Sequence, residues 1–121
     1  MAAPPPTIST HVLDLGRGEP ATGVPVAIFR LSPAGQPELL GEMTTDPDGR
    51  IADLLSGAEL IAGDYQLVFD MAAYADQHDD HGAEPAFFEN LALGFHVDDV
   101  GRGYHVPLLL SPFGVSSYRG S

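Results

Sequence analysis

Residues 104–114 read Tyr-His-Val-Pro-Leu-Leu-Leu-Ser-Pro-Phe-Gly and predict a β-strand that ends in a tight turn. The first seven residues are mostly apolar, and the Ser-Pro-Phe-Gly that follows them is typical of a turn. This turn leads directly into a further short run over residues 115–118. The closing part of the chain is therefore expected to form strands.

Similar short runs precede this one, separated by segments that contain glycine and proline. In the run over residues 24–31, Val24, Val26, Ile28 and Arg30 fall on one face of a strand, since strand side chains alternate between two faces. Runs of this length and spacing predict an all-β domain, an antiparallel sandwich or barrel. The expected strands cover residues 8–13, 24–31, 39–45, 65–69, 87–97, 104–110 and 115–118.

Three places depart from this pattern. Residues 71–81 lack β-branched side chains and hold three alanines, which predicts a short helix that ends near Gly82. A second helix over residues 51–60 is an alternative there, although Gly57 weakens it. Gly94, inside the 87–97 run, is expected to mark a β-bulge.

The length of 121 residues suits one domain with a single core. We expect a flexible proline-rich start over residues 1–7 and one domain over residues 8–121. Cysteine is absent, which excludes disulfides, zinc–thiolate sites and cysteine nucleophiles.

The charge is strongly negative. Seventeen acidic residues face five basic ones, all arginines, for a formal net charge of −12. Such a surface repels phosphate backbones and anionic lipids, so neither nucleic acid nor a membrane is an expected partner. No apolar run approaches a membrane span, and the start does not resemble a secretory signal, so a cytoplasmic location is expected.

Histidines are the natural acid–base candidates, because their pKa lies near neutral pH. His11 shares a strand face with Ser9 and Leu13, and His105 lies in the apolar run described above. A histidine in such a strand is more often structural than catalytic, so both interpretations stay open. His78 and His81 have a spacing that could bind a metal, although a solvated polar segment is the favoured interpretation.

Arg50 and the chain end are two further candidates. Arg50 directly follows Asp46-Pro47-Asp48-Gly49, and arginines next to turns are usually just exposed. The last four residues, Tyr118-Arg119-Gly120-Ser121, bring several hydrogen-bonding groups together, or form a frayed tail.

Three segments together resemble the 5-hydroxyisourate hydrolase family, relatives of transthyretin. The first is Ser9-Thr10-His11-Val12-Leu13-Asp14, followed by Gly18, Pro20 and Ala21. The second is Thr45-Asp46 with Asp48-Gly49-Arg50, and the third is the closing stretch from Tyr104 to Ser121. The resemblance spans residues 8–121, and its final tetrapeptide is highly specific.

The resemblance implies a fold, an assembly and a reaction. The fold would be a transthyretin-like sandwich of two four-stranded antiparallel sheets with one short helix. The assembly would be a homotetramer with active sites at the dimer–dimer interface. The reaction would be hydrolysis of 5-hydroxyisourate, the product of urate oxidation, to 2-oxo-4-hydroxy-4-carboxy-5-ureidoimidazoline, without metal or cofactor.

The family's polar set carries over to this sequence residue by residue. The resemblance implies His11, Arg50, His105 and Ser121 as catalytic residues. It implies substrate binding by His11 and Arg50 together with Tyr118, Arg119 and Gly120. Which histidine acts as the base stays open, and a histidine base predicts a rate that declines on acidification.

Two other functions compete with the hydrolase. A transthyretin-like ligand carrier would keep the fold but would lack this polar set and this tail. A structural, adhesin-type sandwich would need neither inward histidines nor a defined chain end, so removal of Gly120 and Ser121 would leave it unharmed.

Overall fold

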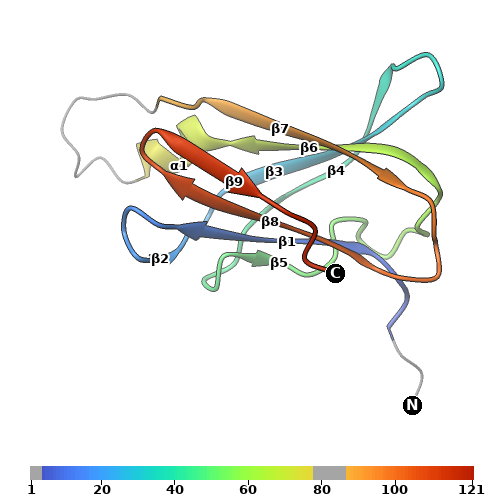
Figure 1. Cartoon of the computed structure of the whole chain (residues 1–121), viewed down its shortest axis with the longest axis horizontal. Coiled ribbons are helices and arrows are strands. Elements are labelled where there is room, and N and C mark those ends of the chain that lie inside the picture. Colours follow the sequence, from blue (N-terminus) through green and yellow to red (C-terminus); the bar gives the residue numbers. More distant parts are fainter. Residues whose placement is uncertain (1–3, 78–86) are drawn as a thin grey trace.

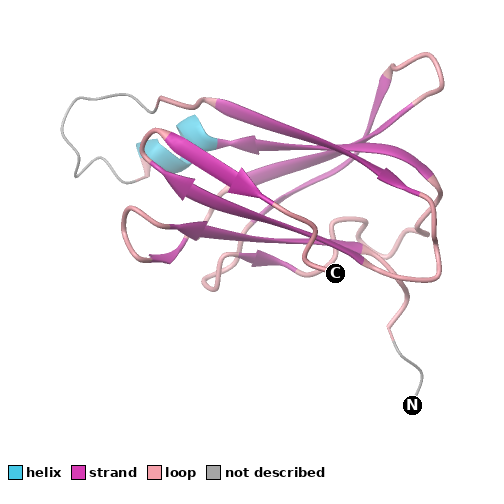
Figure 2. Ribbon diagram, viewed as in Figure 1, coloured by secondary structure: helices cyan, strands magenta, loops and turns pink. Residues whose placement is uncertain are grey.

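Two β-sheets face each other in the computed structural model, which describes residues 4–77 and 87–121 (Figure 1). The first sheet has the order β2-β1-β8-β9, and a further strand, β5, pairs with β1. The second has the order β4-β3-β6-β7, and the only helix of the described residues follows β6 (Figure 2). The first sheet consists of β1 (Ile8–Asp14), β2 (Glu19–Pro20), β5 (Arg50–Ile51), β8 (Tyr104–Ser111) and β9 (Gly114–Ser117). The second consists of β3 (Pro25–Leu31), β4 (Pro37–Thr44), β6 (Gly63–Asp70) and β7 (Asn90–Val97), with the helix α1 at Met71–Asp76.

The expected sandwich of two sheets with one short helix is confirmed, but the first sheet differs in detail. It has five strands, because the two-residue strand β5 is added along β1. It is also not wholly antiparallel, since β1 and β8 run parallel from Ile8↔Tyr104 to Asp14↔Leu110. Only a short hairpin forces its two strands to be antiparallel. The whole second sheet lies between β1 and β8 along the chain, so their pairing is free to be parallel.

The core lies between the sheets and follows the alternation of the strands. On β1 the side chains of Ile8, Thr10 and Val12 are buried, while those of Ser9 and His11 face outward and are partly exposed. Val24, Val26 and Ile28, which were expected to share one face, are also buried, as are the β6 residues Tyr65, Leu67 and Phe69. The hydroxyl of Thr10 avoids an unpaired polar group in the core, because it donates to the Val106 carbonyl at 2.6 Å.

The helix begins at Met71, directly after β6, as expected. Asp70 caps it, because the Asp70 carboxylate accepts the backbone amide of Ala73 at 2.9 Å. The helix ends at Asp76, earlier than the expected end near Gly82, and residues 78–86 lie outside the described part of the chain. None of the helices in the described residues is long and apolar enough to cross a membrane.

Two other expectations are wrong. Residues 54–57 form turns instead of a helix, because Ser56 and Gly57 have φ of 51° and 85°, outside the helical region. Gly94 pairs in register with Gln66 and marks no bulge, while the register shift of this sheet falls between Ile28 and Phe29. Glycine permits a bulge without requiring one, so its presence alone predicts the site poorly.

The turn before β5 is held by a dense set of hydrogen bonds. The Asp46 carboxylate accepts the amides of Asp48 and Arg50, each at 2.9 Å, and the Gly49 amide donates to the Asp46 carbonyl at 2.8 Å. The Gly49 carbonyl then accepts the amide of Val12 at 2.7 Å, which ties the turn to β1. This turn therefore sets where Arg50 lies relative to β1.

Gly49 tests how strongly this turn depends on close packing. Its φ is 76°, and a Cβ at this position would overlap the Val12 carbonyl oxygen. Gly35 has a similar φ of 81°, but a Cβ there meets nothing within 4 Å. Gly35→Ala should therefore lower the free energy of unfolding by only about 1–2 kcal/mol, the cost of a left-handed backbone for alanine. Gly49→Ala should lower the free energy of unfolding by a further ~1–3 kcal/mol, because the new Cβ overpacks the contact with β1.

Urea unfolding of both variants at one protein concentration measures the difference. Equal losses of unfolding free energy in Gly35→Ala and Gly49→Ala would contradict the described contact between the turn and β1.

Candidate active site

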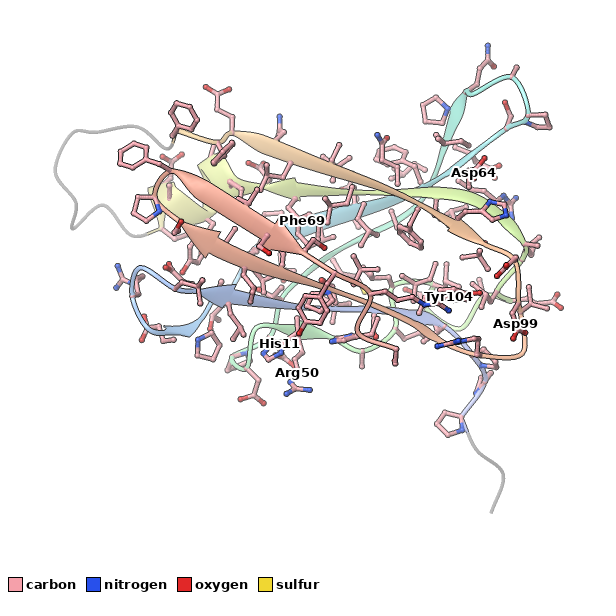
Figure 3. All side chains as sticks on the ribbon, in the orientation of Figure 1. His11, Arg50, Asp64, Phe69, Asp99 and Tyr104 are labelled. Atoms are coloured by element: carbon pink, nitrogen blue, oxygen red, sulfur yellow. The ribbon has the colours of Figure 1, made fainter. Side chains whose placement is uncertain are left out.

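Three predicted site residues meet on the outer face of the first sheet. His11 on β1 is the register partner of Arg50 on β5, and Ser9, two residues before His11, is the register partner of His105 on β8. Register partners in a sheet project from the same face, so these four side chains share the face that points away from the second sheet. Figure 3 shows His11 and Arg50 projecting together from this face.

His105 is held by its neighbouring strand and has a shifted pKa. Its Nδ1 atom lies 2.9 Å from the Ser9 hydroxyl oxygen. Partial burial lowers the pKa of His105 below its usual value, and the nearby His11 and Arg50 lower it further. All three effects disfavour the imidazolium, because it would be poorly solvated and would face other positive charge. At neutral pH His105 is therefore a neutral imidazole that can accept a proton.

His11 is oriented by the turn that also carries Arg50. Its Nε2 atom lies 3.0 Å from the backbone carbonyl oxygen of Asp48. A carbonyl oxygen only accepts hydrogen bonds, so Nε2 carries the hydrogen and, in the neutral ring, Nδ1 carries the lone pair. One turn thus fixes the position of Arg50 along the sheet and the tautomer of His11.

The chain end lies back on His105 and is not a frayed tail. The Gly120 amide donates to the His105 carbonyl at 2.8 Å. A Cβ on Gly120 would lie 2.5 Å from Cδ2 of the His105 ring, so the tail packs here only because residue 120 has no side chain. The Arg119 guanidinium lies over the ring of Tyr104, 4.9 Å from its centre, in a cation–π contact.

The other predicted residues, and His96, which was not predicted as a site residue, make none of these contacts in the described part of the chain. Tyr118 is 58% exposed, and Ser121 is exposed next to Gly120. His96 lies on the second sheet, where its Nδ1 atom is 2.8 Å from the Asp64 carboxylate. The His78 and His81 pair lies outside the described residues. Within the described ranges, 4–77 and 87–121, no group of three or more His, Cys, Asp or Glu side chains could hold a metal ion.

Two residues that contact the predicted site residues were not singled out from the sequence. Ser9 carried a usable signal, because strand alternation placed it on the same face as His11, but its contact with His105 depends on a strand 96 residues away. Tyr104 carried no such signal, since its ring is buried and its role in holding Arg119 depends on the path of the tail.

The fold and this face define a transthyretin-like β-sandwich. A sea bream (Sparus aurata) transthyretin structure superposes with a TM-score of 0.82 at 26% identity, covering 93% of this chain and 94% of that one. The sequence model of the HIUase/Transthyretin family matches residues 8–120, and the chain belongs to this family.

Two relatives carry the name of a hydrolase. A protein of Mesorhizobium japonicum named 5-hydroxyisourate hydrolase is 43% identical over 115 residues, 94% of this chain and 91% of the relative. The solved structure of Klebsiella pneumoniae 5-hydroxyisourate hydrolase has a TM-score of 0.80 at 34% identity and covers 96% of this chain and 99% of that one. These relatives confirm the expected class of enzyme, a hydrolase.

The shifted pKa of His105 gives a direct test of the described cluster. Arg50→Gln removes one of the positive charges beside His105, so the pKa of His105 should rise toward its ordinary value of about 6.5. It should not reach that value, because burial is the largest cause and persists. NMR titration of the imidazole resonances at low salt measures the shift.

Arg30→Gln is the matched control. Arg30 lies on the second sheet, 3.6 Å from Glu38, and its loss should leave the pKa of His105 unchanged. Equal pKa values for His105 in the wild type and in Arg50→Gln would contradict the proximity of these two side chains.

Proposed function

We propose that this chain hydrolyses 5-hydroxyisourate to 2-oxo-4-hydroxy-4-carboxy-5-ureidoimidazoline, a step of urate degradation. The observation that carries the proposal is the meeting of His11, Arg50 and His105 on one sheet face. The relatives named for this reaction support the choice of substrate.

His105 is the proposed general base. Opening a cyclic amide by water requires that the water lose a proton as its oxygen bonds to the carbonyl carbon. A neutral histidine near its own pKa suits this transfer and typically contributes ~10²- to 10⁴-fold in rate. The lowered pKa of His105 keeps it neutral at physiological pH. The same proton then passes to the ring nitrogen as the C–N bond breaks, which leaves a free N–H group and a carboxylic acid that releases its own proton to solvent.

Arg50 and His11 are proposed to bind the reacting amide. The carbonyl oxygen becomes negatively charged as water adds, and a guanidinium already in place stabilises that charge. Loss of one such donor typically raises the activation free energy by about 3–4 kcal/mol. His11 donates Nε2–H to the Asp48 carbonyl, so its Nδ1 atom is not used by that hydrogen bond. Its Nδ1 lone pair can then accept a hydrogen bond from the attacking water or from a substrate N–H. Every step is assigned to side chains, so the proposal requires no metal or cofactor.

The chain end is proposed to complete the substrate site. Gly120 contacts His105 directly, and Ser121 follows it with a hydroxyl and a terminal carboxylate. We assign Ser121 a hydrogen bond to the reacting groups, and Tyr118, Arg119 and Gly120 the shaping of the site. The contact between Arg119 and Tyr104 supports this assignment, because it anchors the tail next to His105.

The proposal extends to a homotetramer with active sites at the dimer–dimer interface. Apolar side chains surround the polar set on the first sheet, and several of them reach solvent. Leu13 and Leu109 are register partners on the outer face and only partly buried, and Tyr118, which follows β9, is exposed. Exposed apolar side chains gathered around a site favour a face that is covered by other copies of the chain.

A coupled assay tests the proposed reaction. Urate and its oxidase generate 5-hydroxyisourate in place, and its decay is followed by ultraviolet absorbance with and without the protein. Wild-type protein should accelerate the decay, and His105→Ala and Arg50→Ala should each lower kcat/KM by at least ~100-fold. His96→Ala is the control, because this histidine pairs with Asp64 on the other sheet, and it should stay within twofold of wild type.

Two results would contradict the proposal in different ways. No acceleration by folded wild-type protein would remove the hydrolase and favour a ligand carrier of the transthyretin type. Acceleration that survives both alanine substitutions would keep the reaction but move it away from this face.

Gly120 provides a test of the tail. Gly120→Ala should push the tail off the His105 ring, and a displacement of about 1 Å can reduce a rate ~100-fold. Gly94→Ala is the matched glycine control, since a Cβ there would lie 4.0 Å from the Tyr65 carbonyl oxygen, at ordinary contact distance. Deletion of Gly120 and Ser121 should be at least as damaging as Gly120→Ala. Full activity of the deletion variant would show that the tail takes no part, as a purely structural sandwich would require.

A further inference from the structure

Ser9 touches the reactive ring of the cluster from the neighbouring strand. Its hydroxyl oxygen lies 2.9 Å from Nδ1 of His105, and the two residues are direct register partners in the parallel ladder between β1 and β8. Both side chains are partly buried, which protects the contact from competing water. We propose that Ser9 is a positioning residue that accepts the Nδ1 hydrogen of His105 and so leaves the Nε2 lone pair free as the base. This inference rests on the proposed function, in which His105 takes the proton from water.

The choice of tautomer follows from what a base requires. A neutral imidazole carries one hydrogen, and the hydrogen bond made by one nitrogen decides which nitrogen holds it. If Ser9 donated to Nδ1, the hydrogen would sit on Nε2, and the ring would have no lone pair for the proton of water. If Ser9 accepts from Nδ1, the Nε2 lone pair is free. Only the second arrangement lets His105 act as the base.

The same contact also chooses between two orientations of the ring. Rotation of the ring by half a turn exchanges Nδ1 with Cδ2. In the observed orientation Nδ1 meets the Ser9 hydroxyl, and Cδ2 lies against Gly120, where a Cβ would approach it to 2.5 Å. The reversed ring would place a carbon against the hydroxyl and a polar nitrogen against the Gly120 Cα. Ser9 and Gly120 thus contact opposite edges of the ring. The Ser9 hydroxyl favours the orientation that places Nδ1 next to it.

The hydrogen bond between Ser9 and His105 depends on the register of the two strands. A shift of β1 by one residue against β8 would move Ser9 to the inner face and bring a buried residue opposite His105. The pairing of β1 with β8 that closes the core therefore also places Ser9 beside His105.

The experiment compares Ser9→Ala with Ser9→Thr, which keeps a hydroxyl on the same carbon. Ser9→Ala should lower kcat by about 10- to 100-fold, the range known for loss of a partner that orients a metal-ligating histidine. KM should change less than twofold, because Ser9 does not touch substrate. Ser9→Thr should recover most of kcat. Ser32→Ala, which removes a hydroxyl that accepts the Gln36 amide in the loop between β3 and β4, is the control and should leave both parameters unchanged.

A second readout does not depend on activity. The ¹⁵N chemical shifts of the His105 ring, measured above its pKa, report which nitrogen carries the hydrogen. Wild type and Ser9→Thr should show a protonated Nδ1 and an unprotonated Nε2, and Ser9→Ala should show a mixture of the two tautomers.

The outcomes separate this inference from the proposed function. An Nε2-protonated ring in active wild-type protein, or a Ser9→Ala variant with unchanged kcat and unchanged tautomer, would overturn the role of Ser9 alone. Wild-type protein without hydrolase activity would overturn the proposed function and, with it, the role of Ser9 in catalysis.

Discussion

The parallel ladder between β1 and β8 is the contact on which the rest of the structure depends. Its inner row closes the core with Ile8, Thr10 and Val12, and its outer row pairs Ser9 with His105. Side chains change face at every residue, so a slip of one position would expose the core row and bury the polar row. The Thr10 hydroxyl, which donates to the Val106 carbonyl at 2.6 Å, opposes such a slip, because the slip would break this hydrogen bond. Core stability and the geometry of the outer cluster are therefore set together.

Positive charge on this face has a clear origin and a clear effect. The chain has a formal net charge of −12 and only five basic residues, yet Arg50 is brought beside His11 and near His105. Its place is set by the turn at Asp46, because the Asp46 carboxylate accepts the backbone amide of Arg50. This bond holds the backbone of Arg50 and does not involve its guanidinium. Partial burial, together with the nearby His11 and Arg50, lowers the pKa of His105 and keeps it neutral. The guanidinium that suits an oxyanion thus also favours a neutral base, in addition to burial and His11.

Much of the fold could be predicted from local sequence, and most of the site could not. Alternation is a property of neighbouring residues, so the strands and the inward rows such as Val24, Val26 and Ile28 were predictable. The parallel direction of β1 and β8, the two-residue strand β5 and the contact between Ser9 and His105 depend on residues far apart in the chain. The helix expected as one possibility over 51–60 failed, because composition alone did not show the turn at Ser56 and Gly57. His11, Arg50 and His105 entered as a set only through resemblance to a family, and register then explains why they meet.

The central claim is that a neutral His105 on this face takes the proton from water. The most direct measurement is the pH dependence of kcat/KM for 5-hydroxyisourate, set beside the pKa of His105 from NMR in the free protein. The account predicts a rate that falls on acidification, with a midpoint below the ordinary histidine value of about 6.5 and equal to the pKa of His105. A rate that stays flat to pH ~5 through the titration of His105, or falls at a midpoint unrelated to it, would contradict the account.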